Sequence, residues 1–320
     1  MKKGTLYETR GAYGETLVEL GNEMGKKIIV LDADLSGSTR TSKFAEKFPD
    51  QFFNMGIAEQ DMMGTAAGLA LSGKTVFTST FAIFAAGRPY EQIRNSIAYS
   101  KLDVKIVASH GGISVGPDGS SHQAIEDISL MRAIPNMRVV VPCDARETVG
   151  AIKTAARTPG PFYIRVMRPK TKVICDEDYR FSLGKAHTMR AGSDITMVAC
   201  GLMVEMALDA ADFLSKEGIE CEVINSSTIK PLDEDTITRS TLNTGACITL
   251  EENTIIGGLG SAVAELLGER NPVPMHRIGI QDKFGQSGTP KELMDTYGLN
   301  RAHIVYAVRE TLARKVENGR

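Results

Sequence analysis

The fold is decided by residues 74–109, KTVFTSTFAIFAAGRPYEQIRNSIAYSKLDVKIVAS. The ends of this stretch, KTVFTSTF at 74–81 and VKIVAS at 104–109, are short apolar runs rich in β-branched residues, which predicts buried strands. The segment AGRPYEQIRNSIAYS at 86–100 has the length and pattern of a helix. Strands separated by a helix-length segment form a βαβ unit, so the stretch predicts parallel strands covered by helices.

The same alternation extends to both sides of this unit. Further strands are expected at 27–34, 137–142, 161–166, 194–201, 219–229, 246–253 and 273–280. Helical patterns lie between them, at 15–25, 59–73, 122–133, 145–157, 204–217, 233–240, 257–270 and 289–318. A polar stretch at 168–194 breaks the rhythm, as an interdomain linker does. The prediction is an α/β protein with mainly parallel sheets flanked by helices in two domains, 1–170 and 194–320, with the linker at 171–193.

Composition excludes several classes of protein. The chain has 320 residues with 37 Lys or Arg and 39 Asp or Glu, a net charge of −2, which is not the footprint of a nucleic-acid or acidic-membrane binder. No apolar run approaches the ~18 residues of a membrane span. The five cysteines are far apart and form no CxxC pair, so we expect neither a disulfide scaffold nor a metal site, and a cytoplasmic location.

A glycine-rich loop follows the strand at 104–109 with the sequence SHGGISVGPDGSSHQ, residues 109–123. Open parallel sheets bind ligands beyond the carboxyl ends of their strands, which is where this loop lies. Glycines let the backbone approach a ligand closely, and His110 and His122, which bracket Asp118, could transfer protons or hold phosphate. The alternative is a polar loop with one capping histidine.

Glu59 is expected at the start of a helix, on the same face as Met63, Ala66 and Ala70. A carboxyl group on such a small-sided apolar face could donate a hydrogen bond or share a proton. The alternative is a first-turn glutamate that stabilises the helix dipole.

Phe81 and Phe84 are three residues apart around the end of a strand and could be core residues or a stacking platform for a planar ring. Arg10, Arg40 and Arg168 each stand in a stretch expected at a strand end or in a loop. Any of the three could bind a phosphate bidentately.

Three of these motifs occur in an order that resembles the pyrimidine-binding domain of transketolases. They are GIAEQDMMGTAAGLA at 56–70, TFAIF at 80–84 and the long segment from SHGGISVGPDGSSHQ to PCDARE at 109–147. The rest of the chain resembles the transketolase C-terminal domain. The chain lacks the GDG motif, followed some 25 residues later by Asn, by which this family holds magnesium and the diphosphate of thiamine diphosphate. The sequence is therefore similar to the C-terminal subunit of a split transketolase.

The resemblance implies a role for each matching residue. Glu59 would be catalytic by hydrogen-bonding the aminopyrimidine ring of thiamine diphosphate, and His110 and His122 would be catalytic by contacting the substrate. The other cofactor-binding residues would be Leu35, Ile57, Phe81 and Phe84, and the other substrate-binding residues Arg10, Ser38, Asp118 and Arg168. The chain departs from many transketolases in reading Ala58-Glu59-Gln60 in place of REH, and in having Gly87 in place of a tyrosine beside the pyrimidine.

The resemblance also implies a partner. Thiamine diphosphate would be shared with an N-terminal subunit that holds Mg²⁺, in an α2β2 assembly that pairs across a two-fold axis and transfers two-carbon ketol units between sugar phosphates. The nearest alternatives are the β subunit of a 2-oxo acid dehydrogenase and a deoxyxylulose-phosphate-synthase-like enzyme, which share AEQ. Asp118 between His110 and His122 favours sugar hydroxyls. A non-catalytic α/β binding or scaffold protein is the alternative of a different class.

Overall fold

Residues 74–109 form two neighbouring parallel strands, β4 (Thr75–Phe81) and β5 (Val104–Ser109), in the computed structural model, which describes residues 1–317. The helix expected at 86–100 is instead two short pieces, α5 (Ala82–Gly87) and the π-helical turn η3 (Gln92–Ala98). Pro89 lies between them, and a proline lacks the N–H that a continuous helix would need there.

These strands belong to a seven-stranded sheet in the order β12-β6-β7-β5-β4-β2-β3. The other members are β2 (Ile28–Asp32), β3 (Phe52–Asn54), β6 (Arg138–Val140), β7 (Phe162–Arg165) and β12 (Thr228–Lys230). All neighbours pair in parallel except β12, which is antiparallel to β6. The sheet is thus mainly parallel, as the sequence predicts.

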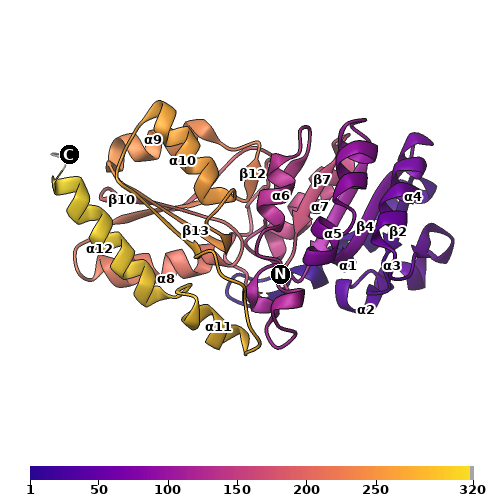
Figure 1. Cartoon of the computed structure of the whole chain (residues 1–320), viewed down its shortest axis with the longest axis horizontal. Helices are drawn as coiled ribbons and strands as arrows, with labels where there is room; N and C mark the ends of the chain where they lie inside the picture. The colour runs from indigo at the N-terminus through magenta and orange to yellow at the C-terminus, as the bar shows by residue number, and fades with distance from the viewer. Residues whose placement is uncertain (318–320) are drawn as a thin grey trace.

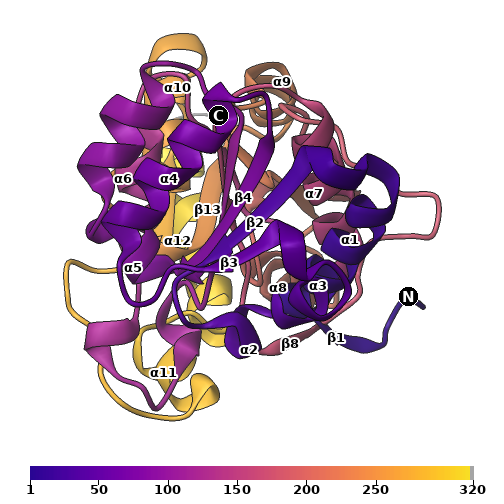
Figure 2. The same ribbon diagram turned by 90° about the vertical axis from the view of Figure 1, so that its right-hand side faces the viewer.

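Helices cover both faces of this sheet (Figure 2). One face carries α5 with α4 (Glu59–Leu71) and α6 (Asp127–Ala133). The other face carries α1 (Thr9–Met24), α3 (Ser42–Lys47) and α7 (Ala145–Arg157). Helix α5 begins directly after the carboxyl end of β4.

A second sheet of five strands fills the other half of the molecule, in the order β14-β13-β10-β11-β9 (Figure 1). Its strands are β9 (His187–Arg190), β10 (Ile195–Ala199), β11 (Cys221–Asn225), β13 (Cys247–Thr254) and β14 (Met275–Ile280). Its helices are α8 (Met203–Ser215), α9 (Glu234–Thr244), α10 (Leu259–Arg270), α11 (Pro290–Thr296) and α12 (Arg301–Glu317). Within residues 1–317, no helix combines the length and the apolar character that a bilayer crossing requires.

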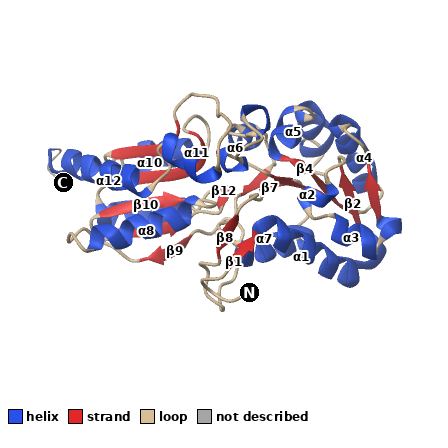
Figure 3. Cartoon of the chain, turned by 90° about the horizontal axis from the view of Figure 1, so that it is seen from below, coloured by secondary structure: helices blue, strands red, loops and turns tan. Residues whose placement is uncertain are grey.

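The single strand expected at 219–229 is two strands that belong to different sheets. β11 pairs with β10 in the second sheet, and after Ser226 and Ser227 the chain enters the first sheet as β12. Two further short strands lie in or beside the expected linker: β8 (Lys170–Lys172), which pairs with β1 (Leu6–Glu8), and β9 (Figure 3). The two halves are therefore joined by one shared strand, β12, as well as by the chain between them.

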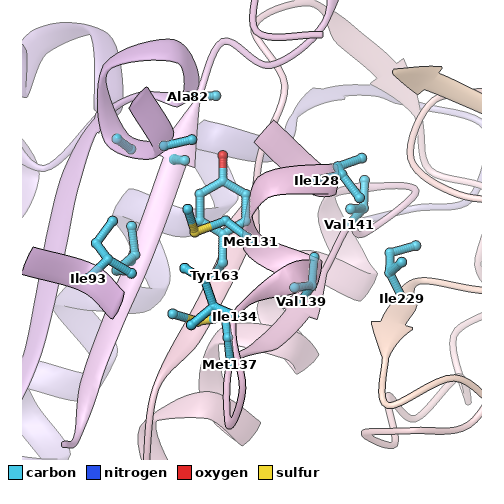
Figure 4. Close-up of a cluster of buried hydrophobic side chains, with 14 of the residues drawn as sticks. Ala82, Ile93, Ile128, Met131, Ile134, Met137, Val139, Val141, Tyr163 and Ile229 are labelled. Atoms are coloured by element: carbon cyan, nitrogen blue, oxygen red, sulfur yellow. The ribbon is translucent and has the colours of Figure 1, made fainter. Parts of the chain in front are cut away.

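The core reinforces this junction. Figure 4 shows Tyr163 among Met131, Ile134 and Val139, with Ile229 of β12 at the same cluster. The hydroxyl of Tyr163 donates a hydrogen bond to Asp127 Oδ2 at 2.7 Å, so its polar end is satisfied inside the core. Ile229 is 1% exposed, and burying such a side chain contributes roughly 1.5–3 kcal/mol. The second half thus supplies part of the core of the first.

Candidate active site

The residues expected to bind cofactor and substrate lie mostly at one edge of the seven-stranded sheet. Leu35 follows β2, Ile57 follows β3, Phe84 follows β4 and His110 follows β5. Because these strands are parallel neighbours, their carboxyl ends meet at this edge. Leu35 is half-buried, whereas Ile57 is 75% exposed and presents apolar surface outward.

Four rings form a contiguous aromatic surface here. The rings of Phe81 and Phe84 are stacked, with centroids 6.0 Å apart and planes 14° from parallel. His110 stacks on Phe81 at 3.9 Å, and His122 meets the ring of Phe84 edge-on at 5.4 Å. Phe81 is 7% exposed and Phe84 is half-buried. The stacked rings of Phe81 and Phe84 thus form an aromatic platform, and the structure brings His110 and His122 into contact with it.

Glu59 is the first residue of α4, and its side chain is 3% exposed. Its Oε1 accepts a hydrogen bond from Nη1 of Arg88 at 2.7 Å, and the guanidinium of Arg88 lies 4.1 Å from the centre of the Phe84 ring. A buried carboxylate and the aromatic platform are thus linked through one arginine. No pattern in the sequence pointed to Arg88, which is 29 residues away from Glu59 along the chain.

The side chain of Arg88 is 48% exposed, so it lies at the solvent edge of the site. Beside it, a Cβ atom built on Gly87 would meet no atom within 4 Å. The space beside Gly87 is therefore open.

His110 is held in an unusual conformation. Its backbone φ of 59° lies in the left-handed region that non-glycine residues rarely adopt, and its side chain is almost fully buried. Nδ1 lies 2.9 Å from the Oγ of Ser109, an interaction that fixes the ring. Burial lowers the pKa of His110 to about 3, and the nearby charges of Arg10, Arg168, Arg40 and His122 add to this. The imidazole is consequently neutral near pH 7 and acts as a hydrogen-bonding group.

A basic cluster lies close to His110. Arg10 donates to the carbonyl of Ser38 at 3.0 Å and forms an ion pair with Glu8 at 3.2 Å. Arg40 donates to the same carboxylate through Nε and Nη2, at 3.2 and 2.8 Å. Burial opposes ionisation of Glu8, but Arg40 and Arg10 outweigh it and lower its pKa. Two arginines share one carboxylate, so the cluster keeps an excess positive charge that suits an anion.

Asp32 shapes the segment that carries Ser38 and Arg40. This buried residue ends β2, and its carboxylate accepts hydrogen bonds from the backbone N–H of Leu35 and from the hydroxyls of Thr39 and Thr41. These bonds fold residues 35–41 back over the strand end, including the short helix α2 (Ser36–Thr39). The segment is thereby placed beside Arg10.

Arg168 and Asp118, both predicted to bind substrate, contact each other. Nη1 of Arg168 donates to Asp118 Oδ1 at 3.1 Å and to the carbonyl of Val115 at 2.6 Å. The backbone N–H of Met167 donates to Oγ1 of Thr9 at 2.8 Å, which ties the segment before Arg168 to the start of α1. Arg168 and Arg10 therefore approach the site from adjacent segments.

Among the described residues, one group has the spacing of metal ligands: Cys143, Asp144 and Cys175. All three are buried, and the two sulfurs are 3.7 Å apart. The carboxylate of Asp144 already accepts N–H bonds from Glu147, Ile174 and Cys175. Burial raises the pKa of the Cys143 thiol, and a metal binds the thiolate. This group therefore fits a structural role at the N-terminus of α7.

The chain matches two protein families. The model of the transketolase pyrimidine binding domain matches residues 6–173, and that of the transketolase C-terminal domain matches residues 184–304. The chain is 48% identical over 309 residues to a Methanocaldococcus jannaschii protein named "Putative transketolase C-terminal section", covering 96% of each.

Two further similarities bear on the site. The chain is 42% identical to the 6-deoxy-6-sulfo-D-fructose transketolase subunit SqwH of a Clostridium species, covering 96% of this chain and 95% of that one. A solved structure described as "Split gene transketolase, inactive beta4 tetramer" superposes with a TM-score of 0.90 at 52% identity. The superposition covers 96% of this chain and 99% of that one.

Proposed function

Since this chain belongs to the transketolase family as a C-terminal subunit, we propose that it supplies the pyrimidine side of a thiamine-diphosphate site. The reaction we propose is two-carbon ketol transfer between sugar phosphates, in the pentose phosphate metabolism of the cytoplasm. The observation that carries the proposal is the buried carboxylate of Glu59 beside the stacked rings of Phe81 and Phe84.

These residues fit an aminopyrimidine ring. The ring is planar and carries nitrogen atoms that need hydrogen-bond partners, and the site offers an aromatic surface with a buried carboxyl group at its side. Thiamine diphosphate, when bound, supplies the nucleophilic carbon for ketol transfer. In the proposed site Glu59 holds a proton against a ring nitrogen, Phe81 and Phe84 orient the ring and exclude water, and Arg88 moves aside to free Glu59.

The basic cluster fits the anionic end of a substrate. Arg10, Arg40 and Arg168 all lie near His110, and each guanidinium can bind phosphate through paired N–H groups. Sulfonate carries a similar set of oxygen acceptors, and one relative is named for a sulfonated sugar. We propose that His110 and His122, both in contact with the aromatic platform, hydrogen-bond the sugar hydroxyls nearest the cofactor, with Ser38 and Asp118 nearby.

The site also needs a partner subunit. We propose that an N-terminal subunit holds Mg²⁺ and the diphosphate and covers Ile57 and Leu35, and that two such pairs assemble as α2β2. The exposure of Ile57 supports this, because an apolar side chain at a site edge gains from being covered. The solved structure of a similar chain assembled with itself is described as inactive.

The experiment is reconstitution. The purified chain is mixed with a candidate N-terminal subunit, Mg²⁺ and thiamine diphosphate, and ketol transfer is measured. We expect Glu59→Gln to lower turnover by about 10²–10⁴-fold, the usual cost of losing a positioned proton-transfer group. The matched control is Asp61→Asn, an exposed acid in the same first turn of α4. Equal activity of both variants at saturating cofactor would end the proposal.

A further inference from the structure

The second half of the molecule contacts the glycine loop, defined as residues 109–123. Nε2 of Gln123 donates to the carbonyl of Gln286 at 2.9 Å. A Cβ atom on Gly119 would lie 2.8 Å from Oγ of Ser287, and one on Gly116 would lie 3.2 Å from Pro290. The segment 286–290, which leads into α11, therefore packs closely along the outer side of the loop.

Glu252 of β13 supports the same loop from beneath. Its side chain is almost fully buried, and Oε1 accepts a hydrogen bond from the backbone N–H of Ser114 at 2.6 Å. Gly112 has a φ of 78°, and a Cβ atom there would lie 2.2 Å from the carboxyl carbon of Glu252. The glycine is thus required twice, by its conformation and by the closeness of Glu252.

Arg165 joins the two halves at this point. Its Nη2 donates to the carbonyls of Ala124 and Glu252, both at 2.9 Å, and its Nε lies 3.2 Å from Asp127. A Cβ atom on Gly111 would overlap Nε of Arg165 at 1.9 Å. The loop backbone at Gly111 therefore rests on a buried ion pair, which resists displacement because its charges are costly to separate.

His110 and His122 lie at the two ends of this supported loop, next to Gly111 and Gln123. We propose that Glu252 is a positioning residue: by holding the backbone of Ser114 it sets the placement of His110 and His122 against the aromatic platform. The second half of the chain thereby takes part in substrate binding without touching substrate. The role of the histidines rests on the proposed function, whereas the support of the loop does not.

The neighbouring residue on the same strand offers a matched control. Glu251 is equally buried, and its carboxylate also accepts backbone N–H bonds, but from Leu259 and Gly260 at the start of α10. Glu251→Ala and Glu252→Ala therefore remove similar interactions from the same strand, and only Glu252→Ala removes one from the glycine loop.

The first measurement is amide hydrogen exchange on the purified chain, without cofactor or partner. We expect Glu252→Ala to speed exchange in residues 112–123 about tenfold or more, and Glu251→Ala to speed it at the start of α10 instead. Glu252→Gln keeps an acceptor for Ser114 and should restore most of the protection. Unchanged exchange in residues 112–123 of Glu252→Ala would overturn the proposal. If that variant fails to fold, Glu252→Asp, whose carboxylate is one methylene shorter and falls short of the Ser114 N–H, takes its place in the comparison.

The second measurement uses the reconstituted enzyme. Glu252→Ala should lower kcat/KM for ketol transfer about tenfold or more and leave the affinity for thiamine diphosphate within about twofold, because Glu59 and Phe84 lie outside the loop. Glu251→Ala at matched folded fraction should stay near wild type. Equal losses in the two variants would overturn the positioning role. If exchange behaves as expected but wild-type enzyme shows no ketol transfer, the proposed function fails and the support of the loop stands.

Discussion

At the scale of single residues, His110 combines a buried neutral imidazole with three nearby arginines. Its pKa of about 3 in the folded chain lies below the ordinary value of roughly 6.5, so the unfolded chain takes up the proton first. The contribution of His110 to the free energy of unfolding is fully present above about pH 6.5. It is lost as the pH falls toward 3, by up to ~1.4 kcal/mol per pH unit.

We therefore expect the free energy of unfolding to fall as the pH is lowered from 6.5 to 5. His110→Asn should reduce this dependence of the unfolding free energy on pH. Urea unfolding of both proteins over this range measures it. His303→Asn, at an exposed position, is the control. An unchanged slope in His110→Asn would show that the imidazole takes up its proton as readily in the folded chain as in the unfolded chain.

Arg168 gives a second prediction at this scale. Arg168→Ala should raise KM for phosphorylated sugars about ten- to a hundredfold more than for unphosphorylated analogues, because a charge-assisted bond to phosphate is lost. Asp118→Asn removes the ion pair but keeps the arginine, so it should spare this preference. Steady-state kinetics of the reconstituted enzyme with both substrate types measures the ratio. An equal loss for both substrate types would assign Arg168 to structure alone.

The sequence could predict the members of the site better than their pairings. Phe81 ends β4, Phe84 follows it, and His110 follows the neighbouring parallel strand β5, so strand prediction alone places them together. Two pairings depend on tertiary packing: the bond from Arg88 to Glu59 and the sharing of Glu8 by two arginines. Neither residue type nor spacing along the chain predicts them.

At the scale of elements, α1 and the segment 35–41 are fitted to each other. A Cβ atom on Gly14 of α1 would lie 2.4 Å from the carbonyl oxygen of Arg40, whose φ is 70°. Gly14→Ala should push Arg40 away and weaken binding of phosphorylated substrate about tenfold, although alanine favours helix. Gly37→Ala, which meets no atom within 4 Å, is the control. Isothermal titration with a sugar phosphate measures the affinity of both variants. Equal affinities would contradict the close packing of Gly14 against Arg40 as a requirement for binding.

Element prediction succeeded where burial is uniform along a strand. β4 and β5 begin and end within one residue of the expected ranges. The strand expected at 219–229 failed because both of its parts are buried, and nothing in that run marks the change of sheet between Asn225 and Thr228. Helix α1 begins at Thr9, before the expected 15–25, because Gly11 and Gly14 weaken the helical pattern that close packing then imposes.

At the scale of the whole molecule, the chain offers one side of the proposed cofactor site. We expect the chain alone to bind thiamine diphosphate weakly or not at all. Adding the partner should strengthen cofactor binding, and the cofactor should strengthen partner binding by the same factor. Calorimetry with each component in turn measures this. Tight magnesium-dependent binding by the chain alone, with full turnover, would contradict the shared site.

The strands β6 and β12 are neighbours in the first sheet but leave the ribosome at different times. Residues 138–140 emerge well before residues 228–230, and at about 5–20 residues per second the interval is several seconds. During that time β6 is an open sheet edge, which other nascent chains on the same messenger can pair with. A gene cut at the linker would leave that edge uncovered for the lifetime of the product.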